Sequence, residues 1–446
     1  MLSVAQFMLI LDVTVVAIAL PTIGTDLGMS RATLTWVVSA YTLMFGGLML
    51  LGGRAADLFG ARRVVLTGLL LFTAASMVSG LATGAGTLIG GRVAQGIGAA
   101  LLSPAALSVI TTTFHGAERN KALGVWAALG GSGSAAGVLL GGLLTAGPGW
   151  QWIFYVNVPV GILVFAALAR MLPSSRPARR ERLDVPGAVL VTAGTATAIY
   201  ALINAGDRGW TSFATLGTLG AAIVLYAVFA LLQRVVRAPL MDLRILTRRP
   251  VATGVFLMLV ATVLMIASFF LGSFYLQRLQ GYGALRTGLL FLPVALTTIA
   301  GAHTAVQAIG HLGPRPVATT GLAVTAAGAA VPALWTGTLP LVAGIAVAAA
   351  GVGAAFVAAS TTALSHVAHS EAGLTSGIVN TAHEFGSAIG AAAVSSIAAA
   401  GIAGGSSAGF TDGFTFAAIT AAAAAVLALL FIPGGAPASE APRFVH

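Results

Sequence analysis

The sequence contains no cysteine and very little charge. Of its 446 residues, 8% are Asp, Glu, Lys or Arg and 58% are hydrophobic, whereas ordinary globular domains carry about 25% charged residues. Without cysteine there can be no disulfide and no thiolate metal site, and the redox compartment stays open. A chain this apolar is expected to be an all-α polytopic membrane protein.

Motifs of common enzymes are also missing. The chain has no HExxH, no GxSxG and no P-loop sequence, so we expect neither an enzyme nor a bound cofactor or metal. The longest loops are under about 20 residues, too short for the soluble domain that a membrane sensor needs. The start lacks a basic segment and its first apolar run contains Asp12, so it predicts a membrane helix rather than a cleavable signal peptide.

Fourteen apolar segments are long enough to cross a bilayer, which takes about 20 residues. The weakest are 187–206 and 374–400, because both are rich in small residues. The predicted spans are 2–22, 34–53, 64–83, 87–112, 122–145, 152–171, 187–206, 213–233, 251–274, 287–309, 317–335, 340–363, 374–400 and 413–433.

The basic residues support this count. Of the 22 Lys and Arg residues, 17 fall in one set of loops, four fall in the other and Arg92 lies within a span. Because basic loops stay in the cytoplasm, the bias places both termini there. It also accounts for the net charge of +10 without a nucleic-acid partner. Basic loops 170–183 and 234–249 could also contact anionic lipids, although topology is the simpler explanation.

A weak internal repeat relates two loops. The segment GGRAADLFGARRVVLTG begins at Gly52, and QAIGHLGPRPVATTG begins at Gln307. With an offset of 253 residues, Gly60 matches Gly313 and Arg62 matches Arg315. Two related halves are a common plan of transporters, with the substrate site at their interface.

Several motifs resemble those of one family, in order along the chain. They are LDVTVVAIALP from Leu11, GGRAADLFGARR, RVAQGIGAALLSP from Arg92, GSAAGVLLGG from Gly133, WQWIFYVNVPVG from Trp150, PLMDLRIL, YLQRLQGYGALRTGLLFLP and GLTSGIVNTAHEFGSAIG. The sequence resembles the major facilitator superfamily, and specifically its 14-transmembrane-helix drug:proton antiporter branch (EmrB/QacA-type). Ala17, Val138 and Gln151 depart from that branch's usual Asn, Pro and Arg.

The resemblance implies the major facilitator fold with two six-helix bundles and two extra central helices. We expect an N-terminal bundle at 1–171, the extra helices and linkers at 172–250, a C-terminal bundle at 251–433 and a cytoplasmic tail at 434–446. We also expect the protein to act as a monomer.

Two glycine-containing motifs suggest moving parts. Gly53, Asp57, Gly60, Arg62 and Arg63 share a short loop, where glycines allow a tight turn and the charges could latch one conformation; a solvated turn that only sets topology is the alternative. A second motif places small residues along one helix face, which suits a sliding surface or static close packing. Its glycines are Gly133, Gly137, Gly141 and Gly142.

Charged groups inside the predicted spans are the candidates for proton coupling. A charge at a helix centre costs about 2.5–3.5 kcal/mol to insert, so such groups are usually functional. Asp12 lies about 15 Å deep, and a carboxylate in a cavity that faces each side in turn can carry a proton. A structural pair with Arg92 is the alternative. Glu384 shares a helix face with Asn380 and Ser387, and Arg92 matches the family residue implicated in proton relay. His303 has no motif around it.

An apolar cavity lined partly by aromatic residues is expected to bind the substrate, although aromatic residues in membrane helices more often face lipid. The candidate cavity residues are Trp36, Tyr41, Gln95, Asn157, Phe270, Phe274, Asn380 and His383.

The sequence therefore predicts a proton-coupled exporter of amphipathic drugs or antibiotics in the cell membrane, working by alternating access. Its partners would be a small, drug-like and possibly cationic molecule, protons and membrane lipids. A narrow exporter of one antibiotic or metabolite on the same fold is the alternative.

Overall fold

The computed structural model contains helices joined by short loops, and no strand, in the residues that it describes, which are 1–172, 183–365, 367, 371–399, 402 and 407–432. The predicted tail 434–446 and most of the basic loop 170–183 lie outside these residues. The helices are α1 (Leu2–Asp26), α2 (Arg31–Phe59), α3 (Ala61–Gly80), α4 (Ala85–Thr113), α5 (Gly116–Ala146), α6 (Trp152–Tyr155), α7 (Asn157–Met171), α8 (Val185–Arg208), α9 (Phe213–Val235), η1 (Leu243–Thr247), α10 (Arg249–Phe274), η2 (Tyr275–Leu279), α11 (Ala284–Leu312), α12 (Pro314–Leu334), α13 (Thr338–Leu364), α14 (Ala372–Ile397) and α16 (Ser407–Phe431).

Twelve helical segments of the described chain are long and apolar enough to cross a membrane. The predicted spans 122–145 and 374–400 fall in α5 and α14, which are helical over 31 and 26 residues but are not among the twelve. The predicted span 152–171 consists of the short α6 followed by α7. α10 continues into a π-helical turn, η2, so this apolar stretch is longer than the predicted 251–274.

The two repeated loops have the same local structure. Gly60 separates α2 from α3 with φ of 90°, and Gly313 separates α11 from α12 with φ of 79°. Positive φ is accessible to glycine at little cost, which explains glycine at both turns. The starts of α2, α3 and α4 each lie 253 positions before the starts of α11, α12 and α13, so the offset seen in the loops extends over three helices.

Helix packing follows the same repeat. α1 packs on α5, and α2 and α3 both pack on α4; correspondingly, α10 packs on α14, and α11 and α12 both pack on α13. Two large contacts join the first six-helix stretch to the last, since α2 packs against α14 and α5 packs against α11; α1 makes smaller contacts with α10 and α11. We refer to the two large contacts as the α2/α14 seam and the α5/α11 seam.

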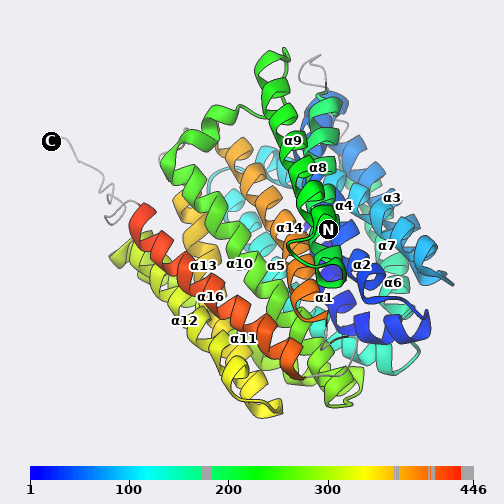
Figure 1. Ribbon diagram of the computed structural model, residues 1–446. Helices are drawn as coiled ribbons and strands as arrows, with labels where there is room; N and C mark the ends of the chain where they lie inside the picture. Colours follow the sequence, from blue (N-terminus) through cyan, green and yellow to red (C-terminus); the bar gives the residue numbers. More distant parts are fainter. Residues whose placement is uncertain (173–182, 366, 368–370, 400–401, 403–406, 433–446) are drawn as a thin grey trace.

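The helices α8 and α9 stand apart from the repeat. α8 packs on both α2 and α14, and α9 packs mainly on α8, so Figure 1 shows the green pair in front of the α2/α14 seam. Asp184 caps α8 by accepting a hydrogen bond from Gly187 N at 2.9 Å, and Gln233 at the end of α9 donates to the same carboxylate at 2.5 Å. These buried bonds join the start of α8 to the end of α9.

One end of the helix array carries most of the described arginines, and we call it the Arg-rich end; it is marked by Arg54, Arg62, Arg63, Arg248 and Arg249. Here Arg248 donates to both carboxylate oxygens of Glu371, at 2.5 and 3.1 Å. These hydrogen bonds hold the pKa of Glu371 below its usual value. The pair joins the start of α10 to the start of α14.

Close packing of small residues predicts that alanine substitutions at two glycines of α11 affect stability very differently. A methyl group on Gly301 would collide with the backbone carbonyl of Ala350 in α13, whereas one on Gly310 would meet no atom within 4 Å. Gly301→Ala should therefore destabilise the fold by about 1–3 kcal/mol through overpacking. Gly310→Ala should leave stability unchanged or raise it, since alanine favours helix. Thermal unfolding of both purified variants in detergent checks this, and equal melting temperatures would contradict it.

Candidate functional site

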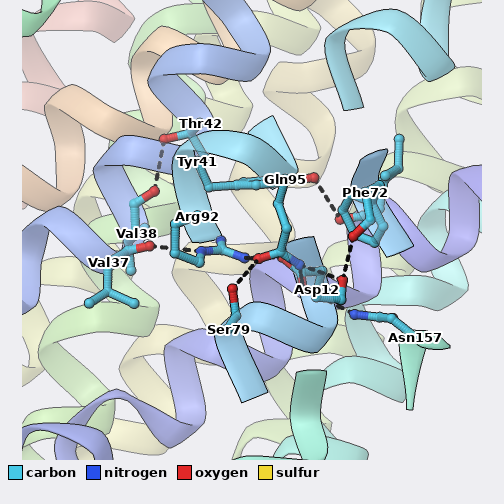
Figure 2. Close-up of polar contacts among 12 residues, drawn as sticks. Asp12, Val37, Val38, Tyr41, Thr42, Phe72, Ser79, Arg92, Gln95 and Asn157 are labelled. Atoms are coloured by element: carbon cyan, nitrogen blue, oxygen red, sulfur yellow. Dashed lines mark hydrogen bonds and ion pairs between the residues drawn. The ribbon is translucent and has the colours of Figure 1, made fainter. Parts of the chain in front are cut away.

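A buried polar cluster surrounds Asp12 in the first half of the chain. Asp12 lies on α1 and is 1% exposed, while Arg92 and Gln95 come from α4 and Asn157 begins α7. Figure 2 shows these side chains converging between the helices. Three helices, with residues up to 145 positions apart, therefore meet at one carboxylate.

The carboxylate of Asp12 is hydrogen-bonded on both oxygens. Oδ2 accepts from Arg92 Nη1 and forms an ion pair with it, and Oδ1 accepts from Gln95 Nε2 at 3.0 Å and from Asn157 Nδ2 at 3.2 Å. Burial of a charge is tolerated when it is paired and its remaining lone pairs are satisfied. The structure thus places Asp12 against Arg92, the pairing that the sequence left as an alternative to a free proton-binding group.

Arg92 is held from several sides. Its Nε donates to the carbonyl of Val37 at 2.9 Å, and Nη1 also donates to Gln95 Oε1 at 3.0 Å. The guanidinium lies 4.2 Å above the ring of Tyr41 and 5.9 Å from that of Phe154. Stacking of arginine on an aromatic face is favourable where water is excluded.

Two serines complete the cluster, and we did not single them out from the sequence. Ser76 accepts a hydrogen bond from Gln95 Nε2 at 2.8 Å, and Ser79 donates to Gln95 Oε1 at 3.4 Å. Both are fully buried on α3. Their spacing of three residues, which puts two hydroxyls on one face of an apolar helix, was the available signal.

A second ionisable site lies on α14, at the α2/α14 seam. Glu384 is 8% exposed, and its Oε1 lies 3.1 Å from Nδ1 of the half-buried His383. Its other oxygen, Oε2, is buried and has no hydrogen-bond partner among the described residues. Gly46 of α2 makes room for the Glu384 side chain, because a methyl group at position 46 would lie 2.7 Å from Glu384 Cβ. A buried acceptor left unsatisfied is costly, so Oε2 marks a place where a hydrogen-bond donor is missing among the described residues.

The predicted cavity residues divide into three groups. Gln95, Asn157 and Tyr41 belong to the Asp12 cluster. Phe270 and Phe274 are buried in the core between the halves, with ring centroids 4.8 Å apart. The others are distributed about the α2/α14 seam: Trp36 packs against residues of α8 and α14, His383 pairs with Glu384, and Asn380 is exposed.

The predicted latch residues lie at the end of α2 and the start of α3. Gly53 and Asp57 fall in α2, Gly60 forms the turn, and Arg62 and Arg63 open α3. Arg62 Nη2 donates to the carbonyl of Ala169 at 2.6 Å, near the end of α7. That bond satisfies one of the carbonyls that a helix end leaves without an internal partner.

The glycines of α5 meet two different helices. Gly133, Gly137 and Gly141 lie against the α1 backbone or side chains, whereas Gly142 lies against the backbone of Ala284 in α11. α5 is one continuous helix through Val138, where the family usually has proline. Small residues here allow two backbones to approach closely.

Comparison with known proteins identifies the family. The model of the Major Facilitator Superfamily matches residues 2–391. The chain belongs to this superfamily. It is 38% identical over 408 residues to a puromycin resistance protein of Streptomyces alboniger, covering 88% of this chain and 80% of that protein. It is 36% identical to a cephamycin export protein of Amycolatopsis lactamdurans, covering 89% and 84%.

The fold agrees with this family. A D-xylose–proton symporter superposes with a TM-score of 0.70 at 13% identity, covering 97% of each chain. The protein is therefore a polytopic membrane transporter rather than an enzyme, and its relatives are antibiotic resistance and export transporters.

The Asp12–Arg92 pair makes a prediction about stability. Asp12→Leu alone leaves the buried guanidinium without its counter-charge and should destabilise the protein by about 3–5 kcal/mol. Combining it with Arg92→Met removes the uncompensated charge and should restore much of that loss. Thermal unfolding of the two single variants and the double variant measures the coupling. Strictly additive losses would show that the pair is not coupled.

Proposed function

We propose that the protein is a proton-coupled exporter of amphipathic drugs or antibiotics that works by alternating access. The observation that carries the proposal is the pair of buried carboxylates, Asp12 and Glu384, in a chain whose relatives export antibiotics or give resistance to them. Ionisable groups inside a membrane protein commonly mark ion and proton pathways.

In this proposal the two carboxylates have different tasks. Glu384 exchanges the proton, since one of its oxygens lacks a partner and it sits where α2 meets α14. Asp12 and Arg92 respond to proton exchange at Glu384 by exchanging their hydrogen-bond and ion-pair partners. Tyr41 of α2 stacks on Arg92, and Gly46 of the same helix lies against Glu384, so α2 contacts both sites.

The transport cycle follows from competition between proton and cargo. The protein accepts substrate from the cytoplasmic side while Glu384 is ionised. After the protein opens outward, proton uptake weakens substrate binding and favours release, and the return step carries the proton inward. A cationic substrate would interact directly with the carboxylate, whereas a neutral one would only need to bind the deprotonated state better.

The membrane arrangement that we propose has fourteen spans, as in the EmrB/QacA-type branch. α5 and α14 are long enough to cross and are packed among the other spans. An even number of spans places both termini on the same side of the membrane, and the distribution of basic residues indicates that this side is the cytoplasm. On this view 1–171 and 251–433 form two bundles, the α8–α9 segment lies between them, the turn between α2 and α3 is a latch, and the transporter is a monomer.

A narrow exporter of one antibiotic remains the second candidate. The two relatives described above are named for a single antibiotic class each, puromycin and cephamycin. Expression in a drug-sensitive host separates the two: resistance to several unrelated cationic compounds supports the broad exporter, and resistance to one compound supports the narrow one.

Proton coupling is tested in proteoliposomes with an imposed pH gradient and a fluorescent cationic dye. We expect Glu384→Gln to lose gradient-driven dye accumulation yet retain dye exchange without a gradient, because only the proton site is removed. Asp12→Asn should slow both processes, since it breaks the ion pair with Arg92.

Asp412→Asn is the matched control, because Asp412 is an exposed acid in α16 and should transport at the wild-type rate. If Glu384→Gln and Asp12→Asn both accumulate dye as the wild type does, the assignment of proton-coupling residues is wrong.

A further inference from the structure

Arg31, the first residue of α2, joins three helices at the end of the array opposite the Arg-rich end, which we call the far end. Its guanidinium donates to Asp207 Oδ2 at 2.7 Å and to the carbonyl of Ile203 at 3.0 Å, both in α8. It also donates to Ser395 Oγ of α14 at 3.0 Å. Because the Arg31 side chain is only 7% exposed, these partners replace most of the water around its charge.

The bond from Arg31 to α14 is part of a closed ring of hydrogen bonds. Thr35 Oγ1 donates its one proton to the carbonyl of Arg31 at 2.9 Å, so Ser395 is the donor in the 2.6 Å bond between Ser395 and Thr35. The ring runs from the Arg31 guanidinium through Ser395 and Thr35 back to the backbone of Arg31. It closes the far end of the α2/α14 seam through two buried hydroxyl groups.

The bonds of Arg31 to α8 are stronger than its bond to α14. Hydrogen bonds gain strength when the groups are ionised, and with Asp207 both partners carry a charge. Separating Arg31 from Asp207 would leave a largely buried cation without its counter-charge, whereas separating it from Ser395 leaves only a neutral hydroxyl without a partner. When the seam opens at the far end, the bonds to α14 are therefore the ones that break.

Packing along α8, which lies in front of α2 and α14 in Figure 1, is compatible with this difference. On the α2 side, Thr192 lies in the space that a side chain at Gly47 would need. On the α14 side, Ile199 shares an apolar cluster with Phe385, and Gly206 lies against the α14 backbone. Apolar contacts are non-directional, so they can re-form after α8 has shifted along α14.

At the Arg-rich end, the α8–α9 pair is bonded to the linker that follows it. The carboxylate of Asp184 accepts from Gln233 at 2.5 Å and from the N–H of Leu240 at 3.1 Å, and the next N–H donates to Gln233 at 3.2 Å. Arg248, at the other end of this linker, is paired with the residue that caps α14. Residues 242–247 lie between these two attachments and can absorb a displacement of the pair relative to the second half.

We propose that α8 and α9 move as one body with the first six-helix stretch, held to α2 by Arg31 and Asp207, and slide over α14 when the α2/α14 seam opens at the far end. The inference rests on the alternating access proposed above. Arg31 acts as a positioning residue that releases Ser395 and keeps Asp207. Its charge is thereby neutralised throughout the cycle, at a place where an unpaired cation would be costly.

Three exposed residues at the far end can report this motion: Leu81 after α3, Phe213 at the start of α9 and Leu334 at the end of α12. Leu81 and Leu334 are 253 positions apart, so they mark equivalent places in the two halves. Because the chain contains no cysteine, cysteines introduced in pairs at these positions carry the only spin labels. Double electron–electron resonance in lipid nanodiscs then measures each distance at acidic and alkaline pH, with and without a cationic dye.

We expect the distance between positions 81 and 334 to change with conditions. The distance between 213 and 334 should change with it, while the distance between 81 and 213 stays constant. A constant distance between 213 and 334, or a change in both distances from 213, would overturn the inference. If the distance between 81 and 334 changes under no condition, the proposed alternating access fails, and this inference fails with it.

Two variants separate the bonds of Arg31. Asp207→Ala removes the counter-charge on α8 and should broaden the distribution of distances between positions 81 and 213. Ser395→Ala removes only the bond to α14, so this distribution should stay narrow while the population with an open far end increases. Asp412→Asn, at an exposed acid near the far end of α16, is the matched control and should behave as the wild type.

The distance between positions 81 and 334 also shows whether each variant is folded, because unfolding would remove its defined maximum. A folded Asp207→Ala protein whose distances between 81 and 213 match those of the wild type would show that Arg31 does not hold α8. A broadened distribution in Ser395→Ala instead would show that α14 holds α8 in place. Either result would overturn the role assigned to Arg31.

Discussion

The ion pair between Asp12 and Arg92 is the constraint on which the first half of the structure depends. Each charge is fully buried, and each is stable there only because the other is present and because Gln95, Asn157 and the carbonyl of Val37 complete the hydrogen bonding. The pair fixes α1 against α4 and the start of α7. Any movement of these helices must carry the charges together or exchange their partners, and this gives charge a direct influence on conformation.

The second half repeats the helices without repeating the charges. At the offset of 253 residues, the positions of Asp12, Arg92 and Gln95 are occupied by Met265, Ile345 and Ala348. Its core is held by close backbone contacts instead, such as Gly321 against Gly351. The one carboxylate buried within its helices among the described residues, Glu384, lies at the seam with α2. The two halves therefore differ in where they hold buried charge, although their helices pack alike.

Much of this architecture could be predicted from the sequence, because apolar runs and arginine-bearing loops follow directly from the cost of placing charge in lipid. The repeated turns at Gly60 and Gly313 could also be predicted, because few residues other than glycine adopt a positive φ. The position of α8 over the α2/α14 seam was not predictable, because an apolar helix does not encode which neighbour it covers. Ser76 and Ser79 were missed because single hydroxyls are common in membrane helices. The count of candidate spans differs at α5 and α14, and the small and polar residues of α14 lower its hydropathy.

The central claim is that a buried carboxylate exchanges a proton for cargo. The most direct measurement is the release of protons when a cationic substrate is added to purified protein in a weakly buffered solution with a pH indicator. The account predicts that the wild-type protein releases protons on binding and that Glu384→Gln releases far fewer while still binding the substrate. Binding without any proton release from the wild-type protein, across the pH range in which it transports, would contradict the account.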